Sequence, residues 1–136
     1  MSDEKQGGTC QDVAWYRMEQ SLDDLDTAKL LLREKKYRAA NNRAYYACFH
    51  AMNALLALSS IAFKRHKDVI AYFNRYYVHE NVFPREFGGM VGRLQMIRTK
   101  SDYDDMYVAD KEESTDQVEI AEKIILAISE YIKEKV

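Results

Sequence analysis

The segment from residue 37 to residue 59 constrains the fold of this chain most strongly, because it reads as a helix that is apolar on every side. Its apolar residues are Ala39, Ala40, Ala44, Ala47, Phe49, Ala51, Met52, Ala54, Leu55, Leu56, Ala57 and Leu58. At 3.6 residues per turn these positions surround the whole helix axis. Such a helix lies at the centre of a domain or forms half of a subunit interface. We therefore expect a central helix that its neighbours approach closely over the small alanine side chains.

The segments on either side show one-sided helical periodicity. Residues 11–35 carry an apolar stripe with spacings of three and four, from Met18 to Leu32. The last segment, from about residue 112, repeats this rhythm from Val118 to Ile132. Two further helices are predicted over residues 67–79 and 85–100, separated by Pro84. The expected fold is all-α, an up-and-down bundle of four to five helices.

Length and composition set the class of protein. The 136 residues suit one domain, which we place at residues 11–136 after a flexible leader at residues 1–10. Twenty basic and 22 acidic residues give a net charge of -2, which argues against coating nucleic acid by charge alone and leaves room for a local basic patch. Cys10 and Cys48 indicate no disulfide framework. With no signal-peptide pattern and no apolar run of the ~18 residues that cross a membrane, we expect a cytoplasmic protein without a membrane partner.

The central helix carries the first candidate site. Arg43 and His50 are seven residues apart, so their side chains differ by only ~20° around the helix axis, and Tyr46 lies on the same stripe. A histidine can exchange a proton near neutral pH, and an arginine binds phosphate oxygens with a permanently charged planar group. Arg43 and His50 are therefore catalytic candidates for phosphodiester cleavage, with the Tyr46 hydroxyl as an auxiliary donor. Alternatively, both side chains satisfy buried carbonyls or carboxylates from another helix.

A second polar cluster spans residues 98–105, where cations, carboxylates and a tyrosine alternate. Arg98 is a candidate auxiliary cation, and Asp102 and Tyr103 are candidate binding residues for a phosphate or a nucleotide. In the structural alternative, Asp102 neutralises a buried Arg43, which removes the cost of an unpaired charge, and Tyr103 packs beneath the central helix.

His66 is a third candidate, this time for binding. It follows Lys64 and Arg65 and precedes Lys67, so it could contact a phosphate backbone, although a solvated helix start is the favoured interpretation. The three histidines have no zinc-site spacing, and the carboxylates near residue 104 do not repeat as Mg²⁺ ligands do. The glycines at 88, 89 and 92 form no nucleotide-binding fingerprint. We predict no metal site and no cofactor.

These motifs together resemble a known group. The run Asn42-Arg43-Ala44-Tyr45-Tyr46-Ala47-Cys48-Phe49-His50-Ala51 is similar to the signature helix of a bacterial and archaeal HEPN-domain family. The later His66-Lys67, the turn at residues 83–87, and Arg98 followed by residues 101–104 resemble that family in order and spacing. The resemblance covers about residues 12–134, nearly the whole chain.

The resemblance implies a compact helical domain that forms a homodimer and is often encoded beside a minimal nucleotidyltransferase in toxin–antitoxin pairs. Active HEPN toxins are metal-independent ribonucleases with an arginine, four to six residues, and then a histidine. Arg43 and His50 have six residues between them and fit this formula.

One departure leaves two functional alternatives open. In many of these toxins the motif lies in a late helix, and the corresponding segment here has Asp102 and Tyr103 in place of the histidine. The active pair is then Arg43 and His50, which gives a dimeric ribonuclease toxin. Otherwise the chain is a non-catalytic module that binds a nucleotidyltransferase partner or a nucleotide. The sequence leaves open whether the protein is an enzyme.

Overall fold

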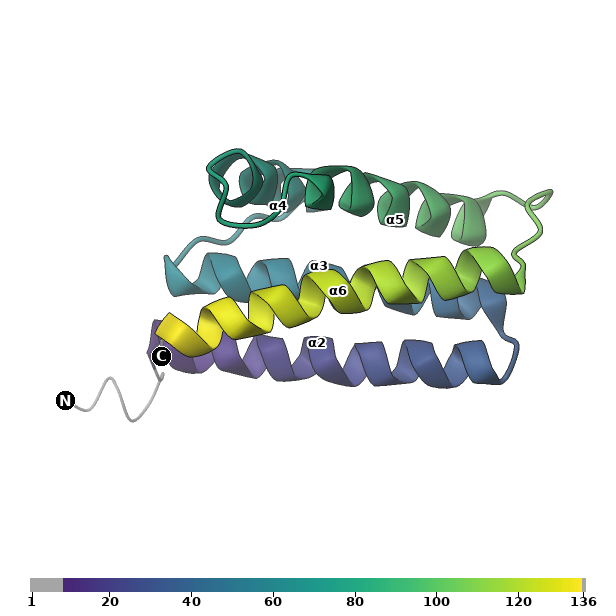
Figure 1. The fold of residues 1–136 in the computed structure, drawn as a ribbon, viewed down its shortest axis with the longest axis horizontal. Helices are drawn as coiled ribbons and strands as arrows, with labels where there is room; N and C mark the ends of the chain where they lie inside the picture. Colours follow the sequence, from purple (N-terminus) through teal and green to yellow (C-terminus); the bar gives the residue numbers. More distant parts are fainter. Residues whose placement is uncertain (1–8, 136) are drawn as a thin grey trace.

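The computed structural model describes residues 9–135 and consists of helices joined by turns and loops (Figure 1). The elements are α2 (Cys10–Arg33), α3 (Tyr37–Leu58), α4 (His66–Phe73), the π-helix η1 (Asn74–Val78), α5 (Glu86–Tyr103) and α6 (Lys111–Lys135). The long helices run up and down, with α2, α3 and α6 in one group and α5 packed on α3 and α6 (Figure 1). The short α4 lies at one end of α5. This arrangement confirms the predicted all-α bundle.

Helix α3 lies at the centre of the bundle, as its sequence predicts. It contacts α2, α4, α5 and α6. Its alanines at 40, 44, 47, 51 and 54 are fully buried. Because these side chains are small, α2 packs closely enough on α3 for the Ser21 hydroxyl of α2 to donate a hydrogen bond to the Ala47 carbonyl, at 2.6 Å. This contact fixes the register of the two helices.

The start of α2 is one residue earlier than predicted. Thr9 caps the helix: its hydroxyl accepts a hydrogen bond from the Asp12 amide, and the Asp12 carboxylate accepts one from the Thr9 amide, both at 3.1 Å. This reciprocal capping box stabilises the first turn, so Cys10 is already helical. Residues 1–8 of the predicted leader lie outside the described residues.

The predicted third helix is not a continuous α-helix. It is α-helical over His66–Phe73 and continues as a π-helix over Asn74–Val78. A π-turn rotates the side chains that follow it relative to an α-helical pattern. Within the π-helix, Tyr76 is 45% exposed, whereas its neighbour Tyr77 is buried.

The ends of the chain's other elements lie within three residues of the predicted ends, the largest difference being the extension of α5 to Tyr103. Both cysteines are free thiols, and burial raises the pKa of the Cys48 thiol to about 12. None of the helices described in residues 9–135 combines the length and the apolar character needed to cross a membrane.

Candidate functional site

Asp24 of α2 holds the two catalytic candidates of α3. One carboxylate oxygen lies 2.7 Å from Nδ1 of His50, and the other lies 3.3 Å from Nη1 of Arg43. Asp24 itself is 21% exposed, whereas the side chains of Arg43 and His50 are 34% and 35% exposed. The carboxylate thus contacts Nδ1 of His50, and Nε2 has no hydrogen-bond partner among residues 9–135, while both candidate side chains remain accessible to solvent.

Tyr46 joins this pair to Arg98. The Arg43 guanidinium lies 5.2 Å from the centre of the Tyr46 ring, and the Arg98 guanidinium lies 5.1 Å from it. Arg98 also donates a hydrogen bond to the Tyr46 hydroxyl, at 2.7 Å. Two guanidinium groups from α3 and α5 therefore flank one aromatic ring, which stabilises them through cation–π contacts. The four predicted residues Arg43, Tyr46, His50 and Arg98 lie in one cluster within a single subunit.

The predicted pair of Arg43 and Asp102 is wrong. Asp102 instead pairs with Arg98, one helical turn earlier on α5, at 3.0 Å. Asn42 explains the difference, because its side-chain amide lies between the two residues: the carbonyl oxygen accepts from Arg43 at 3.1 Å, and the amide nitrogen donates to Asp102 at 3.0 Å. The carboxylate that neutralises Arg43 is Asp24.

Tyr103 does not pack beneath α3, contrary to the prediction. It is 72% exposed, and its ring lies 5.6 Å from the Arg98 guanidinium. The reason is that α5 continues to Tyr103, so this residue lies on the last, outward-facing turn of the helix. Tyr103 therefore lies at the edge of the cluster and is free to contact a ligand.

His66 is brought to the same cluster from the start of α4. Its ring lies 3.9 Å from that of Phe49 and 5.7 Å from that of Tyr46, and Nδ1 lies 3.0 Å from the Tyr45 hydroxyl. Desolvation, with contributions from Arg98 and His50, lowers the pKa of His66. Burial raises the pKa of Tyr45 to about 12, so the phenol keeps its proton and can donate it to Nδ1. A neutral His66 then carries its ring proton on Nε2 and can donate a hydrogen bond there. The His66 ring is therefore packed among aromatic side chains of the cluster, which the alternative of a solvated residue at a helix start does not explain.

A cavity of about 530 Å³ adjoins Arg43. It is lined by Thr27, Leu31, Arg38, Ala39, Asn42, Arg43, Ser101 and Asp102. It gives a ligand access to the Arg43 and Asp102 side of the cluster. Within residues 9–135 no three His, Cys, Asp or Glu side chains lie close enough together to hold a metal ion.

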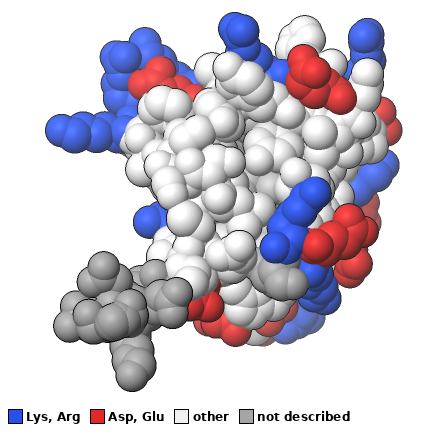
Figure 2. Space-filling model, turned by 90° about the vertical axis from the view of Figure 1, so that its left-hand side faces the viewer, with Lys and Arg blue, Asp and Glu red and all other residues white. Residues whose placement is uncertain are grey.

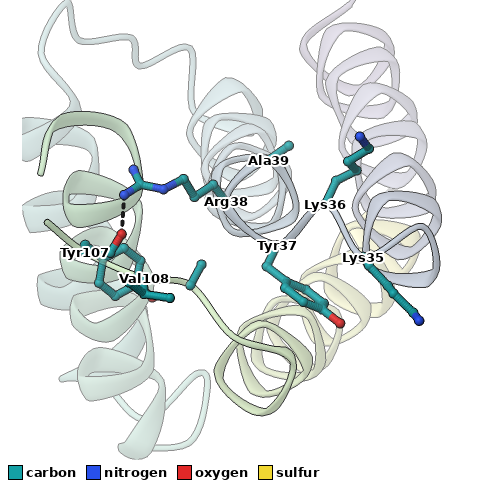
Figure 3. A pocket seen from close by; sticks show the side chains of 8 residues that line it. Lys35, Lys36, Tyr37, Arg38, Ala39, Tyr107 and Val108 are labelled. Atoms are coloured by element: carbon teal, nitrogen blue, oxygen red, sulfur yellow. Dashed lines mark hydrogen bonds between the residues drawn. The ribbon is translucent and has the colours of Figure 1, made fainter. Parts of the chain in front are cut away.

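A second cavity, of about 540 Å³, lies between the α2–α3 turn and the loop after α5 (Figure 3). Arg38 extends across it and donates hydrogen bonds to three carbonyls of the α5 end and loop: those of Ser101, Asp104 and Tyr107. Figure 3 shows the bond to Tyr107. By holding these carbonyls, Arg38 fixes the end of α5 that carries Asp102 and Tyr103.

Sequence reasoning missed three residues of this cluster: Asp24, Asn42 and Tyr45. A usable signal existed for Asp24. Two antiparallel helices joined by a short turn place residues at equal distances from the turn opposite each other. The turn at residues 34–36 puts Asp24 opposite residue 46, between Arg43 and His50.

Comparisons with known proteins agree with this architecture. The model of the HEPN domain matches residues 14–131. A UPF0332 protein of Thermotoga maritima is 33% identical over 119 residues, which are 88% of this chain and 90% of that protein. A Methanocaldococcus jannaschii protein named "Putative toxin" is 38% identical over 81 residues, 60% of each chain. A second protein of that organism with the same designation is 27% identical over 97 residues, which are 71% of this chain and 66% of that protein. The family match spans the helices that carry every residue of the cluster, and the chain belongs to the HEPN-domain family.

Proposed function

We propose that this protein is a metal-independent ribonuclease of the toxin type, with His50 as the proton-transfer residue and Arg43 and Arg98 as the phosphate-binding cations. The observation that carries the proposal is the contact of one carboxylate, Asp24, with both His50 and Arg43. A carboxylate on Nδ1 fixes the tautomer and orientation of an imidazole and stabilises its protonated form. The relatives named as toxins support the same biological role.

The chemistry follows from the free nitrogen of His50. Nε2 can take the proton of a ribose 2′-hydroxyl, whose oxygen then attacks the adjacent phosphorus. The bond from phosphorus to the 5′-oxygen breaks, and that oxygen receives a proton from an acid, either protonated His50 of the second site in a dimer or water. The products are a 2′,3′-cyclic phosphate and a 5′-hydroxyl. Arg43 and Arg98 stabilise the additional negative charge on the phosphate oxygens during the attack.

The homodimer is part of this proposal. The side chains of Arg43 and His50 are about one-third exposed. In a dimer, these exposed parts would face Arg43 and His50 of the second subunit, so that two proton-transfer histidines would act on one phosphate. A minimal nucleotidyltransferase would be the antitoxin partner. Light scattering of the purified protein tests the dimer, and co-expression with the nucleotidyltransferase of the same operon tests the partner.

The test of the nuclease is cleavage of a labelled RNA in the presence of a chelator. We expect wild-type protein to cleave and to leave cyclic phosphate ends, and His50→Ala to lose on the order of 10²–10⁴-fold in rate. His79→Ala is the matched control, because His79 is an exposed histidine outside the cluster. Equal cleavage by wild type and His50→Ala would reject His50 as the proton-transfer residue.

The second candidate is a non-catalytic module that binds a nucleotidyltransferase or a nucleotide. It is favoured by one observation: Asp24 already neutralises the Arg43 charge within one subunit, as a structural ion pair does. Absence of cleavage by pure wild-type protein, together with binding of a nucleotide or of the partner, would support this reading.

A further inference from the structure

We propose that the aromatic row of Phe63, Tyr72 and Tyr76, whose two outer rings are exposed, binds the unpaired bases of an RNA strand that leads away from the candidate cleavage site, together with the cations around it. We call this surface the α4 aromatic face. The identity of the strand rests on the proposed ribonuclease function. The binding surface itself rests on the geometry and charge of residues that the cleavage chemistry does not use.

The three rings form a continuous row. Phe63 and Tyr72 have ring centres 5.9 Å apart, and Tyr72 and Tyr76 have ring centres 4.5 Å apart. Phe63 is 41% exposed and Tyr76 is 45% exposed, so the outer two rings of the row present much of their surface to solvent. Tyr76 lies in the π-helix, next to the buried Tyr77. Exposed aromatic rings in a row are the platform on which successive bases stack in proteins that bind single strands.

Charge on this face favours a polyanion over a protein partner of ordinary composition. Residues 60–79 contain the cations Lys64, Arg65, Lys67 and Arg75 and a single carboxylate, Asp68, so this segment carries +3 in a chain whose net charge is -2. All four cations are exposed. Figure 2 shows the end of the molecule nearest α4, where charged side chains of both signs surround a largely uncharged centre. A symmetric contact between two copies would bring these cations together, which argues against self-association here.

One cation contacts the aromatic row directly. The Arg75 guanidinium lies 5.3 Å from the centre of the Tyr76 ring. An arginine beside an exposed ring can bind the phosphate that joins two stacked bases and can itself stack on a base. Arg65 forms an ion pair with Asp68, with 3.3 Å between Nε and a carboxylate oxygen. The lysines at 64 and 67 have no ion pair among the described residues.

His66 links this face to the candidate site along the chain. This residue begins α4 three positions after Phe63, and its ring packs on Phe49 beside Tyr46. A strand with its scissile phosphate at Arg98 and His50 would therefore pass His66 and Lys67 before it reaches the aromatic row. The connector between α3, which ends at Leu58, and α4, which begins at His66, carries Phe63, so the aromatic row begins a few residues before the helix start that contacts the cluster.

The experiment measures binding of a strand that cannot be cleaved by attack of a 2′-hydroxyl. The probe is a fluorescent oligodeoxythymidine of about 12 nucleotides, which falls within single-strand site sizes, and the readout is fluorescence anisotropy. We expect the double variant Phe63→Ala/Tyr76→Ala to bind roughly tenfold or more weakly than wild type. The control is Tyr16→Ala on α2, which removes a ring that is 61% exposed at another place and should leave binding unchanged.

Charge is tested in the same assay with Lys64→Glu/Lys67→Glu. We expect weaker binding and a smaller dependence of affinity on salt, because fewer phosphate contacts release fewer counterions. All substituted side chains are exposed, and thermal melting of each variant checks that it folds. Binding by the aromatic double variant equal to that of wild type would overturn the proposal, as would an equal loss with Tyr16→Ala.

The outcomes also separate this proposal from the ribonuclease. Cleavage by wild type with no effect of the aromatic double variant on strand binding would reject the α4 aromatic face and keep the nuclease. Loss of binding in the double variant, with no cleavage by wild type, would support the α4 aromatic face and reject the nuclease. A change of molecular mass in light scattering on substitution of Phe63 and Tyr76, without a change in strand binding, would make the face an interface between copies and reject it as a strand-binding site.

Discussion

The two carboxylates at the edges of the polar cluster, Asp24 and Asp102, contact different groups. Asp24 bridges two helices and contacts His50, the residue that can exchange a proton. Asp102 pairs with Arg98 on its own helix and reaches α3 only through Asn42. The sequence made Asp102 the expected partner of the α3 arginine, but in the structure the carboxylate beside the acid–base residue is Asp24. In the proposed ribonuclease, Asp24 would therefore set the tautomer of His50, whereas Asp102 would orient Arg98.

The largest effect is expected for Asp24→Asn. An uncharged amide cannot stabilise protonated His50 and does not hold one tautomer as firmly, so we expect cleavage of labelled RNA to fall on the order of 10²–10⁴-fold. Asp23→Asn makes the same change at the neighbouring, exposed residue and should keep wild-type activity. Equal activity of the two variants would remove Asp24 from the mechanism.

The next largest effect is expected on stability, at the packed interface between α2 and α3 that places Asp24 opposite α3. Ala47 is fully buried against α2, so Ala47→Leu overfills this interface and should lower the free energy of unfolding by about 1–3 kcal/mol. Chemical denaturation measures this loss. Ala39→Leu adds the same side chain at an exposed position of α3 and should leave stability nearly unchanged. If the two variants had the same free energy of unfolding, that result would contradict the central position of α3.

A smaller effect is expected for Asp102→Asn. Arg98 keeps its hydrogen bond to Tyr46, so we expect a stability loss of about 1 kcal/mol and less than a tenfold loss of cleavage. Asp105→Asn, in the exposed loop that follows α5, is the control. A loss of cleavage as large as that of Asp24→Asn would mean that the two carboxylates have equivalent roles.

The smallest effect concerns His66 and pH. Because its folded-state pKa lies below the ordinary value of 6.5, the unfolded chain binds the proton more readily, and stability should fall as the pH drops below about 6.5. His66→Asn removes this contribution. Melting temperatures between neutral and mildly acidic pH should therefore decline more for wild type than for the variant, and parallel declines would contradict the neutral state of His66 in the folded protein.

The fold was largely predictable because helical periodicity is a local property of the sequence. The alanine-rich segment of α3 and the stripes of α2 and α6 identified the bundle, and only the π-helix after Phe73 disturbed the pattern. For residues on one helix, such as Arg43 and His50, the sequence alone predicted that they belong to the same cluster. Its partners depend on the register between helices: Arg43 pairs with Asp24 of α2, and Asn42 lies between Arg43 and Asp102, which pairs with Arg98 on its own helix.

The short turn between α2 and α3 has a consequence for folding. Asp24 is 26 residues from His50 and 19 from Arg43, whereas Arg98 is 52 residues from Tyr46. Closing the shorter loops costs less entropy, and contacts between near neighbours in the chain form faster. We expect the helical hairpin to bring its histidine, arginine and carboxylate together early, before α5 adds the second arginine. The half of the cluster that contains His50 would then be the part synthesised first and assembled first as the chain leaves the ribosome.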